Sequence, residues 1–324
     1  LIQGGPRSRS HDRFRQVNDF YYLCGVQAPH AYLLLDGRDG RTSLFLPHQS
    51  EQRAQQEGRI PSATHPAESA EAAGVDLVEG PEMLAVALEK ARHIYVPMRQ
   101  GEGPAMSWDT LQRSQQERVA DPWDGLPDRS RHFVQLLRSR CPAAEITDLA
   151  PILDEMRLVK SGTEQDLLRE AGRICSLAVT EAMKTTRPGT MEYELDAVLR
   201  YTYLVNGSRD VSYRAIIAGG QNAWYGHYDA NDAVLNAGDL VLLDCGPDYN
   251  YYTSDIGRMY PVDGTYTDTQ RQLYGFIVEY HKEFLSLLGP GVDDEQVRLE
   301  AAKRMARVVD ATRWEQPIFE SAAR

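Results

Sequence analysis

Residues 241–262, VLLDCGPDYNYYTSDIGRMYPV, constrain the fold more than any other stretch of the chain. Apolar runs rich in Val, Leu, Ile and Tyr flank a centre with Gly, Pro and Asn, which is the pattern of a β-hairpin. Two aspartates interrupt these runs, Asp244 in the first and Asp255 at the start of the second. Because Asp is depleted in strands and a buried carboxylate is costly without a partner, the hairpin needs a reason to carry both acids.

Hairpin geometry offers one such reason. If the turn is centred on Tyr249-Asn250, Asp244 lies directly opposite Asp255 on one face of the sheet, with Cβ atoms about 4.5–5.5 Å apart. Two like charges at that distance repel, and a cation between them removes the conflict. Oxygen ligands favour Mg²⁺ or Mn²⁺, and an added histidine shifts the preference towards Mn²⁺, Co²⁺, Fe²⁺ or Zn²⁺. The alternative, two partly exposed hairpin acids without a metal, stays open on this geometry.

A second polar cluster precedes the hairpin. The glycine-containing segment Ile216–Asn222 is followed by Gly226-His227-Tyr228. A lone histidine after such a bend is more often a structural residue than a catalytic one. The residues alone therefore leave the role of His227 open.

Charge and composition exclude several classes of protein. A net charge of −12 argues against nucleic acid as a partner, since phosphate binding needs clustered Lys and Arg. The arginine-rich stretches 7–15 and 129–140 are short and have acids within or just before them, so we interpret them as solvated faces. The apolar runs are shorter than the ~18 residues of a membrane span. We expect a soluble protein without a membrane-spanning segment.

The four cysteines lack CxxC spacing and fall in different predicted elements, which indicates thiols in a reducing compartment rather than a disulfide framework or zinc site. The sequence shows no signal peptide and predicts a cytoplasmic protein. Because the chain starts abruptly at Leu1, we expect its natural N-terminus to be missing, and this leaves a signal peptide open.

A length of 324 residues suits about two domains of ~100–200 residues each. Residues 1–148 alternate short apolar runs with helical patterns and predict an α/β domain. Asp36–Gly40 is a predicted hairpin turn, and residues 99–128 are a predicted loop with one short helix. Strands are expected at Phe20–Leu23, Ala31–Leu35, Ser43–Pro47 and His93–Pro97, and helices at Pro81–Arg92 and Ser130–Arg138.

Residues 149–324 predict an α+β domain. Ser161 and Glu164 form a capping box that starts a helix ending at 187–189. Thr190 caps a second helix that ends at 206–207. Strands then follow at 215–218 and in the hairpin, and further helices at 267–288 and 293–309.

An ordered series of motifs across both domains resembles the Xaa-Pro aminopeptidases, metallopeptidases with the pita-bread fold. The double-aspartate segment is its most specific part. The series consists of Phe14-Arg-Gln16, Asp19-Phe-Tyr-Tyr-Leu-Cys-Gly25, Glu145-Ile-Thr-Asp-Leu149, Asp154-Glu-Met-Arg-Leu-Val-Lys-Ser161, Ile217-Ala-Gly-Gly-Gln-Asn222, His227-Tyr228, Asn231, Gly238–Gly246, Tyr252–Arg258 and Pro261-Val262.

The resemblance implies a creatinase-N-like α/β domain followed by a pita-bread catalytic domain. It implies two divalent ions, usually Mn²⁺, with Asp244 chelating one ion and Asp255 bridging both. The ions would lower the pKa of a shared water, so that hydroxide attacks the peptide carbonyl. His227 matches a histidine expected to bind substrate or to stabilise the tetrahedral intermediate. The implied substrates are peptides with proline in the second position, and homodimers or homotetramers are common in the resembling family.

The sequence departs from the family's pattern at its C-terminal end. The family adds a ligand histidine and two glutamates after the aspartates, whereas His281 is the only later histidine here and lies in a predicted surface helix. We therefore expect a fragment cut at both ends, inactive by itself, whose intact parent is the enzyme. Three alternatives stay open: an Xaa-Pro dipeptidase (prolidase), a non-catalytic pita-bread module that binds peptides or proteins, and a metal-free creatinase-type enzyme, which the retained aspartates argue against.

Overall fold

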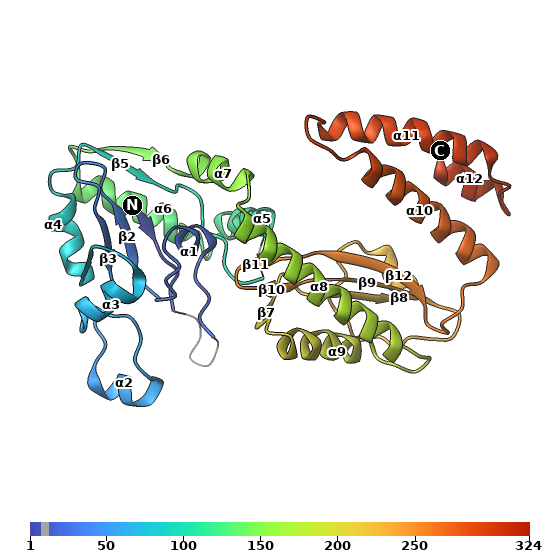
Figure 1. The fold of residues 1–324 in the computed structure, drawn as a ribbon, viewed down its shortest axis with the longest axis horizontal. Coiled ribbons are helices and arrows are strands. Elements are labelled where there is room, and N and C mark those ends of the chain that lie inside the picture. The colour runs from blue at the N-terminus through green and yellow to red at the C-terminus, as the bar shows by residue number, and fades with distance from the viewer. Residues whose placement is uncertain (8–12, 106) are drawn as a thin grey trace. The chain divides into compact units, whose positions relative to one another are not determined.

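The computed structural model describes residues 1–7, 13–105 and 107–324 (Figure 1). Part of the arginine-rich stretch 7–15 falls outside the described residues. The chain forms two compact units, each made of segments that are distant in sequence. Unit 1 comprises Leu1–Arg173, Gly207–Arg214 and Gly246–Ser254, and unit 2 comprises Ile174–Asn206, Ala215–Cys245 and Asp255–Arg324.

Unit 1 contains a four-stranded sheet in the order β1-β2-β3-β4, which is antiparallel except for the parallel β3–β4 pair. Its strands are β1 (Ile2–Gln3), β2 (Tyr32–Leu35), β3 (Thr42–Phe45) and β4 (Leu77–Glu79). Strands β5 (His93–Val96) and β6 (Glu145–Asp148) form a separate parallel pair. The predicted strands after residue 30, and the turn between β2 and β3, are thereby confirmed.

The predicted strand Phe20–Leu23 is wrong, because these residues lie in helix α1 (Asn18–Cys24). Gly25 ends α1 with φ +67°, a left-handed conformation that favours glycine. Phe20 is fully buried in the core that covers the four-stranded sheet. A short apolar run does not by itself distinguish a strand from a buried helical turn, and here the tertiary core selects the helix.

The other helices of unit 1 lie between and after its strands. The predicted helix Pro81–Arg92 is shorter and divided in two, and residues 99–128 hold a thirteen-residue helix where a short one was expected. These helices are α2 (Glu51–Glu57), α3 (Pro66–Ala73), η1 (Pro81–Met83), α4 (Leu84–Leu88), α5 (Trp108–Ala120), α6 (Arg129–Arg140) and α7 (Ala150–Leu158).

Unit 1 also includes the tip of the aspartate hairpin. Strands β7 (Asp210–Val211), β10 (Pro247–Tyr249) and β11 (Tyr252–Thr253) form a sheet in the order β11-β10-β7. The Arg15 Nε donates to Asp248 Oδ2 over 2.6 Å, and the Tyr21 and Tyr251 rings stack with centroids 3.5 Å apart. Segments more than 200 residues apart in sequence thus fix the hairpin tip.

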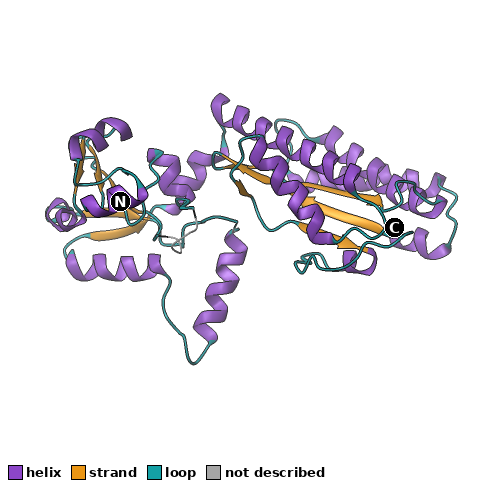
Figure 2. Cartoon of the chain, turned by 90° about the horizontal axis from the view of Figure 1, so that it is seen from below, coloured by secondary structure: helices purple, strands orange, loops and turns teal. Residues whose placement is uncertain are grey.

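Unit 2 is built on three antiparallel strands in the order β12-β9-β8 (Figure 1). The strands are β8 (Ile216–Gly219), β9 (Leu240–Cys245) and β12 (Ile256–Pro261). Helix α8 (Gly162–Thr185) begins in unit 1 and ends in unit 2, where the Cys175 thiol donates to the Cys245 carbonyl over 3.2 Å. Helix α9 (Glu192–Val205) follows, and Figure 2 shows helices running alongside the strands.

The predicted helix starts are confirmed at two capping boxes. Ser161 N donates to Glu164 Oε2 over 2.7 Å, and Thr267 N donates to Gln270 Oε1 over 2.9 Å. The residue that precedes α9 is Met191 rather than the predicted Thr190. The remaining helical elements are η2 (Gly220–Trp224), α10 (Asp268–Leu287), α11 (Asp294–Ala311) and α12 (Pro317–Ala323).

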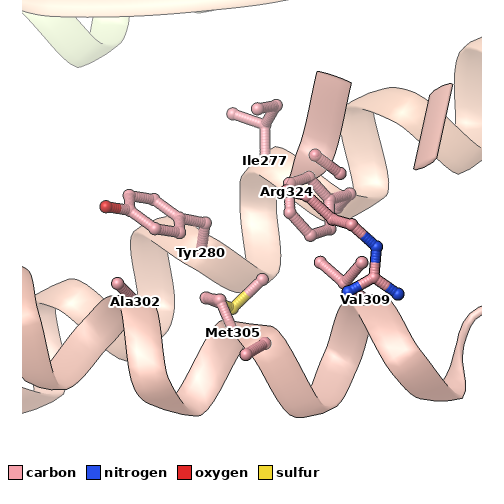
Figure 3. A pocket seen from close by; sticks show the side chains of 9 residues that line it. Ile277, Tyr280, Ala302, Met305, Val309 and Arg324 are labelled. Atoms are coloured by element: carbon pink, nitrogen blue, oxygen red, sulfur yellow. The ribbon is translucent and has the colours of Figure 1, made fainter. Parts of the chain in front are cut away.

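Helices α10, α11 and α12 enclose a pocket of about 440 Å³ (Figure 3). Its lining is mainly apolar, with Ile277 and Tyr280 from α10 and Met305 and Val309 from α11, and Arg324 at its edge. Across the described part of the chain, no helix has the length and apolar character needed to cross a membrane.

Candidate metal centre

Strand β9 places Asp244 by simple alternation. Val241, Leu243 and Cys245 are fully buried, whereas Leu242 and Asp244 on the other face are partly exposed. Since successive side chains of a strand point to opposite faces, Asp244 lies on the face away from the fully buried side chains. The strand is hydrogen-bonded on both sides, by β8 and β12, which makes it a rigid support for a ligand.

The predicted register is wrong by two residues. Asp244 pairs with Gly257, not with Asp255, because the hairpin turns at Asn250-Tyr251. Both turn residues have positive φ, +51° and +71°, as a two-residue type I′ turn requires. The expected turn at Tyr249-Asn250 lies one residue too early in the chain.

A shift of two residues keeps the aspartates on one face. Asp255 directly precedes β12 and lies two positions before Gly257, so the ladder extended by one residue makes it the diagonal neighbour of Asp244, at a typical Cα separation of about 7–8 Å. Gly257 has no side chain, and a Cβ built there meets no atom within 4 Å. The two carboxylates therefore border an open position on the sheet, and Asp255 itself is exposed.

Between the two aspartates the strands come together at Gly246. A Cβ at this position would overlap the carbonyl oxygen of Ser254 and lie 2.6 Å from Ser212 Oγ. The Ser212 hydroxyl lies within hydrogen-bonding distance of both strands. Its oxygen is 2.9 Å from Gly246 O and 3.2 Å from Ser254 O. Only glycine fits this close approach, which sets the spacing of the residues that flank it.

Neutral thiols pack on the face of β9 opposite the aspartates. Each of the four cysteines is a thiol outside any disulfide, and the Sγ atoms of Cys175 and Cys245 lie 4.0 Å apart. The hydrogen bond with Cys175 raises the pKa of the Cys245 thiol, and burial and the charge of Asp244 raise it further. Cys175 and Cys245 therefore act as small buried residues, whereas Cys24 and Cys141 are partly exposed.

His227 lies in the turn after η2, and its side chain is exposed. The loop around it is fixed by Glu192, which is fully buried, and by Tyr228 and Asn231. Glu192 was not predicted as a site residue. In the sequence Glu192 is only an acid in the first turn of a predicted helix. That position does not reveal that a distant loop packs over its carboxylate.

The two aspartates do not by themselves make a metal site. Among the described residues, no group of three or more His, Cys, Asp or Glu side chains could hold an ion. Strand alternation, extended by one residue to Asp255, puts it on the same face as Asp244, and His281 is exposed on α10. Two carboxylates beside an open position fit a hard divalent cation as part of its ligand set.

Comparisons with known proteins agree with this geometry. Residues 166–313 match the model of metallopeptidase family M24, and residues 6–95 match the aminopeptidase P N-terminal domain. The segment 166–313 of the chain is therefore similar to the M24 metallopeptidases. The architecture of the chain is an α/β N-terminal domain followed by a pita-bread domain, and the family implies divalent metal ions.

Individual proteins are similar to the chain over different shares of its length. A Haemophilus influenzae Xaa-Pro aminopeptidase is 41% identical over 162 residues, covering 48% of this chain and 38% of that protein. A rat Xaa-Pro dipeptidase is 28% identical over 302 residues, covering 90% of this chain and 56% of that protein. The structure of the Yersinia pestis proline aminopeptidase P II superposes with a TM-score of 0.76 at 29% identity, covering 100% of this chain and 72% of that one.

The chain spans about half the length of the curated relatives that it matches, 38% and 56% of the two named here. The similarity covers segments of both domains, and the aspartate hairpin lies inside the segment that matches M24. Because the relatives are longer, the activity, substrates and partners of the whole protein are proposals.

Proposed function

We propose that the intact protein containing this chain is a metal-dependent aminopeptidase that releases the N-terminal residue from Xaa-Pro peptides. The observation that carries the proposal is the pairing of Asp244 with Gly257, where a Cβ would meet no atom, two residues after Asp255 and inside the segment that matches M24. The Xaa-Pro aminopeptidase relatives support the same substrate class.

Asp244 and Asp255 are the proposed ligands of two divalent ions, which we propose are Mn²⁺. Asp244 would help to hold one ion, and Asp255, which has two carboxylate oxygens, would help to hold both. When bound, the ions would acidify a water molecule for attack on the peptide carbonyl. This role suits rigid supports, since Asp244 is on the central strand and Asp255 is held by its connection to β12.

His227 is the proposed contact to the reacting peptide. The imidazole is exposed, and Glu192 fixes its loop by accepting a hydrogen bond from Tyr228. The imidazole can therefore hydrogen-bond to the substrate, or to the oxygen that gains charge in the tetrahedral intermediate. His227 is therefore proposed as a catalytic residue that is not a metal ligand.

Substitution of the bridging residue tests the activity. In the intact protein loaded with Mn²⁺, Asp255→Asn should abolish hydrolysis of an Xaa-Pro tripeptide, because the amide cannot bridge two cations. Unchanged hydrolysis by the variant would refute the proposal. An intact protein without hydrolysis, but with measurable peptide binding, would instead support the non-catalytic binding module.

A second candidate is an Xaa-Pro dipeptidase, favoured by the similarity to the rat dipeptidase over 90% of the chain. Parallel assays of an Xaa-Pro dipeptide and an Xaa-Pro-Xaa tripeptide distinguish the two activities. We expect the tripeptide to be cleaved. Cleavage of the dipeptide alone would establish the dipeptidase.

The remaining proposals concern the organisation of the intact protein. We place the domain boundary between residues 148 and 149, and we expect a cytoplasmic homodimer or homotetramer. With a net charge of −12, the partners are proposed to be peptides rather than nucleic acids. We also propose that a histidine and two glutamates beyond this chain complete the metal site.

A further inference from the structure

Glu192, in the first turn of α9, is a fully buried carboxylate that receives four hydrogen bonds. Its Oε1 accepts from the Gly219 backbone N–H over 2.8 Å and from Asn222 Nδ2 over 3.2 Å. Its Oε2 accepts from Tyr228 Oη over 2.9 Å and from the Ala233 backbone N–H over 3.0 Å. A carboxylate offers about four lone-pair positions, so these donors saturate it.

The four donors come from the whole length of one loop. Gly219 is the last residue of β8, Asn222 lies in η2, Tyr228 directly follows His227, and Ala233 lies where the loop returns. The Glu192 backbone N–H also donates to the Ala233 carbonyl over 3.0 Å. A single side chain therefore holds the start, middle and end of the segment 219–233, which we term the histidine loop.

Asn231 fastens the same loop to β8 from another position. Its Oδ1 accepts from Ile217 N over 3.1 Å and its Nδ2 donates to Ala215 O over 2.7 Å, so that the amide continues the hydrogen-bond ladder of the strand. Asn231 is buried and has φ +50°, a conformation that Asn tolerates better than most residues. The histidine loop is thus held by two buried polar side chains.

Tyr228 links these hydrogen bonds to the neighbouring residue, His227. Burial raises the pKa of Tyr228 to about 12, and the hydrogen bond to Glu192 contributes, so the hydroxyl remains a donor at neutral pH. Its oxygen also accepts from Asn222 Nδ2 over 3.1 Å. The preceding residue, His227, extends an exposed imidazole from a backbone that is fixed one residue later.

We propose that Glu192 is a positioning residue that presets His227 by holding the histidine loop. The inference rests on the proposed contact between His227 and the substrate. Displacement of a catalytic group by about 1 Å can cost on the order of 10²-fold in rate. Glu192→Gln keeps the size of the side chain but replaces one acceptor oxygen with an NH₂ group, which faces loop N–H or O–H groups.

Glu194 provides the matched control. It lies on the same first turn of α9, is exposed, and accepts from the Met191 backbone N–H over 2.7 Å without touching the histidine loop. Glu194→Gln removes the same charge from the same helix N-terminus. An effect that arises only from the helix dipole or from charge loss would therefore be equal in the two variants.

The first measurement is hydrogen exchange of the backbone amides of the 324-residue chain. In Glu192→Gln, the amides of residues 219–233 should exchange at least tenfold faster than in Glu194→Gln, whereas those of α10 should be unchanged. Equal exchange in the two variants would overturn the proposal. Tyr228→Phe removes one donor only and serves if Glu192→Gln fails to fold, with the same expected direction.

The second measurement is a double-mutant cycle in the intact, Mn²⁺-loaded protein, with an Xaa-Pro tripeptide as substrate. Glu192→Gln should lower kcat/KM at least tenfold, but by less than threefold when His227→Ala is already present, because Glu192 acts through that residue. Independent, multiplying effects would overturn the positioning role and leave the proposed function standing. Wild-type activity of His227→Ala would instead remove the proposed role of His227.

Discussion

The close approach of the two hairpin strands at Gly246 gives a quantitative prediction. In Gly246→Ala the new methyl group would overlap Ser254 O and lie 2.7 Å from the carbonyl carbon of Ser254. These are backbone atoms, so no side-chain rotation relieves the overlap, and one strand has to move. Ser212 bonds to both strands here, through its N–H to Gly246 O over 2.9 Å and through its hydroxyl to Ser254 O over 3.2 Å.

Two terms contribute to the expected loss. Overpacking a well-filled site costs about 1–3 kcal/mol. Loss of the Ser212 hydrogen bonds adds about 0.5–1.5 kcal/mol for each bond broken. With both Ser212 bonds lost, we therefore expect Gly246→Ala to lower the free energy of unfolding by roughly 2–6 kcal/mol, a large part of the ~5–15 kcal/mol typical of a folded domain.

Urea titration followed by circular dichroism measures this loss, and Gly257→Ala is the control. Gly257 lies in β12, where a Cβ meets no atom within 4 Å, so its substitution should change the free energy of unfolding by no more than about 1 kcal/mol. Equal stability of the two variants, or a loss below about 1 kcal/mol in Gly246→Ala, would refute the reasoning from close approach.

Three further predictions follow from the same structure. Arg15→Ala should lower the free energy of unfolding by about 3–5 kcal/mol in chemical denaturation, because Asp248, 7% exposed, loses its ion-pair partner. The double variant Arg15→Ala/Asp248→Ala should be little less stable than Arg15→Ala. Fully additive losses would contradict the pairing. The Tyr228 hydroxyl should titrate near pH 12 by NMR of ¹³C-labelled tyrosine. Its contribution to stability should be complete below pH 10 and lost as the pH rises through 12. A midpoint near pH 10 would contradict the hydrogen bond to Glu192. Calorimetry should show weak Mn²⁺ binding by this chain that Asp255→Asn weakens further, and tight binding of two ions would contradict an incomplete ligand set.

The long periodic segments of the fold could be predicted from the sequence. Apolar residues at helical spacing between a capping box and a glycine or proline terminator located α8 and α10, since such helices are determined locally. Strand alternation likewise located β9 and showed that Asp244 departs from the apolar pattern.

The hairpin register could not be predicted, because its cause lies elsewhere in the chain. A non-glycine residue with φ +71° is unusual, and Tyr251 adopts it while stacked on Tyr21 and with the Arg15 guanidinium 4.2 Å from its ring centroid. Local turn chemistry at 249–251 contains no trace of these contacts. The register error of two residues follows from that missing information.

The role of Glu192 was hidden for a related reason. An acid at a helix N-terminus is ordinarily solvated and favourable to the helix dipole, so the sequence offers no cause to bury it. Only the return of residues 219–233 over the start of α9 supplies four donors and makes burial of the carboxylate stable. The motif containing His227 and Tyr228 was found, but not the residue that holds it.

The attachment of the hairpin tip to the N-terminal segment has a consequence for synthesis of the chain. Arg15 and Gln16 bond to residues 233 and 235 positions later, so their contacts wait until residue 251 has been made. At about 5–20 residues per second, that delay is roughly 12–47 s. During this interval the Tyr21 ring and the Arg15 guanidinium lack their partners on the hairpin. Arg15, Gln16 and Tyr21 are thus made long before they reach their final contacts, and the hairpin that carries the two aspartates should form late in folding.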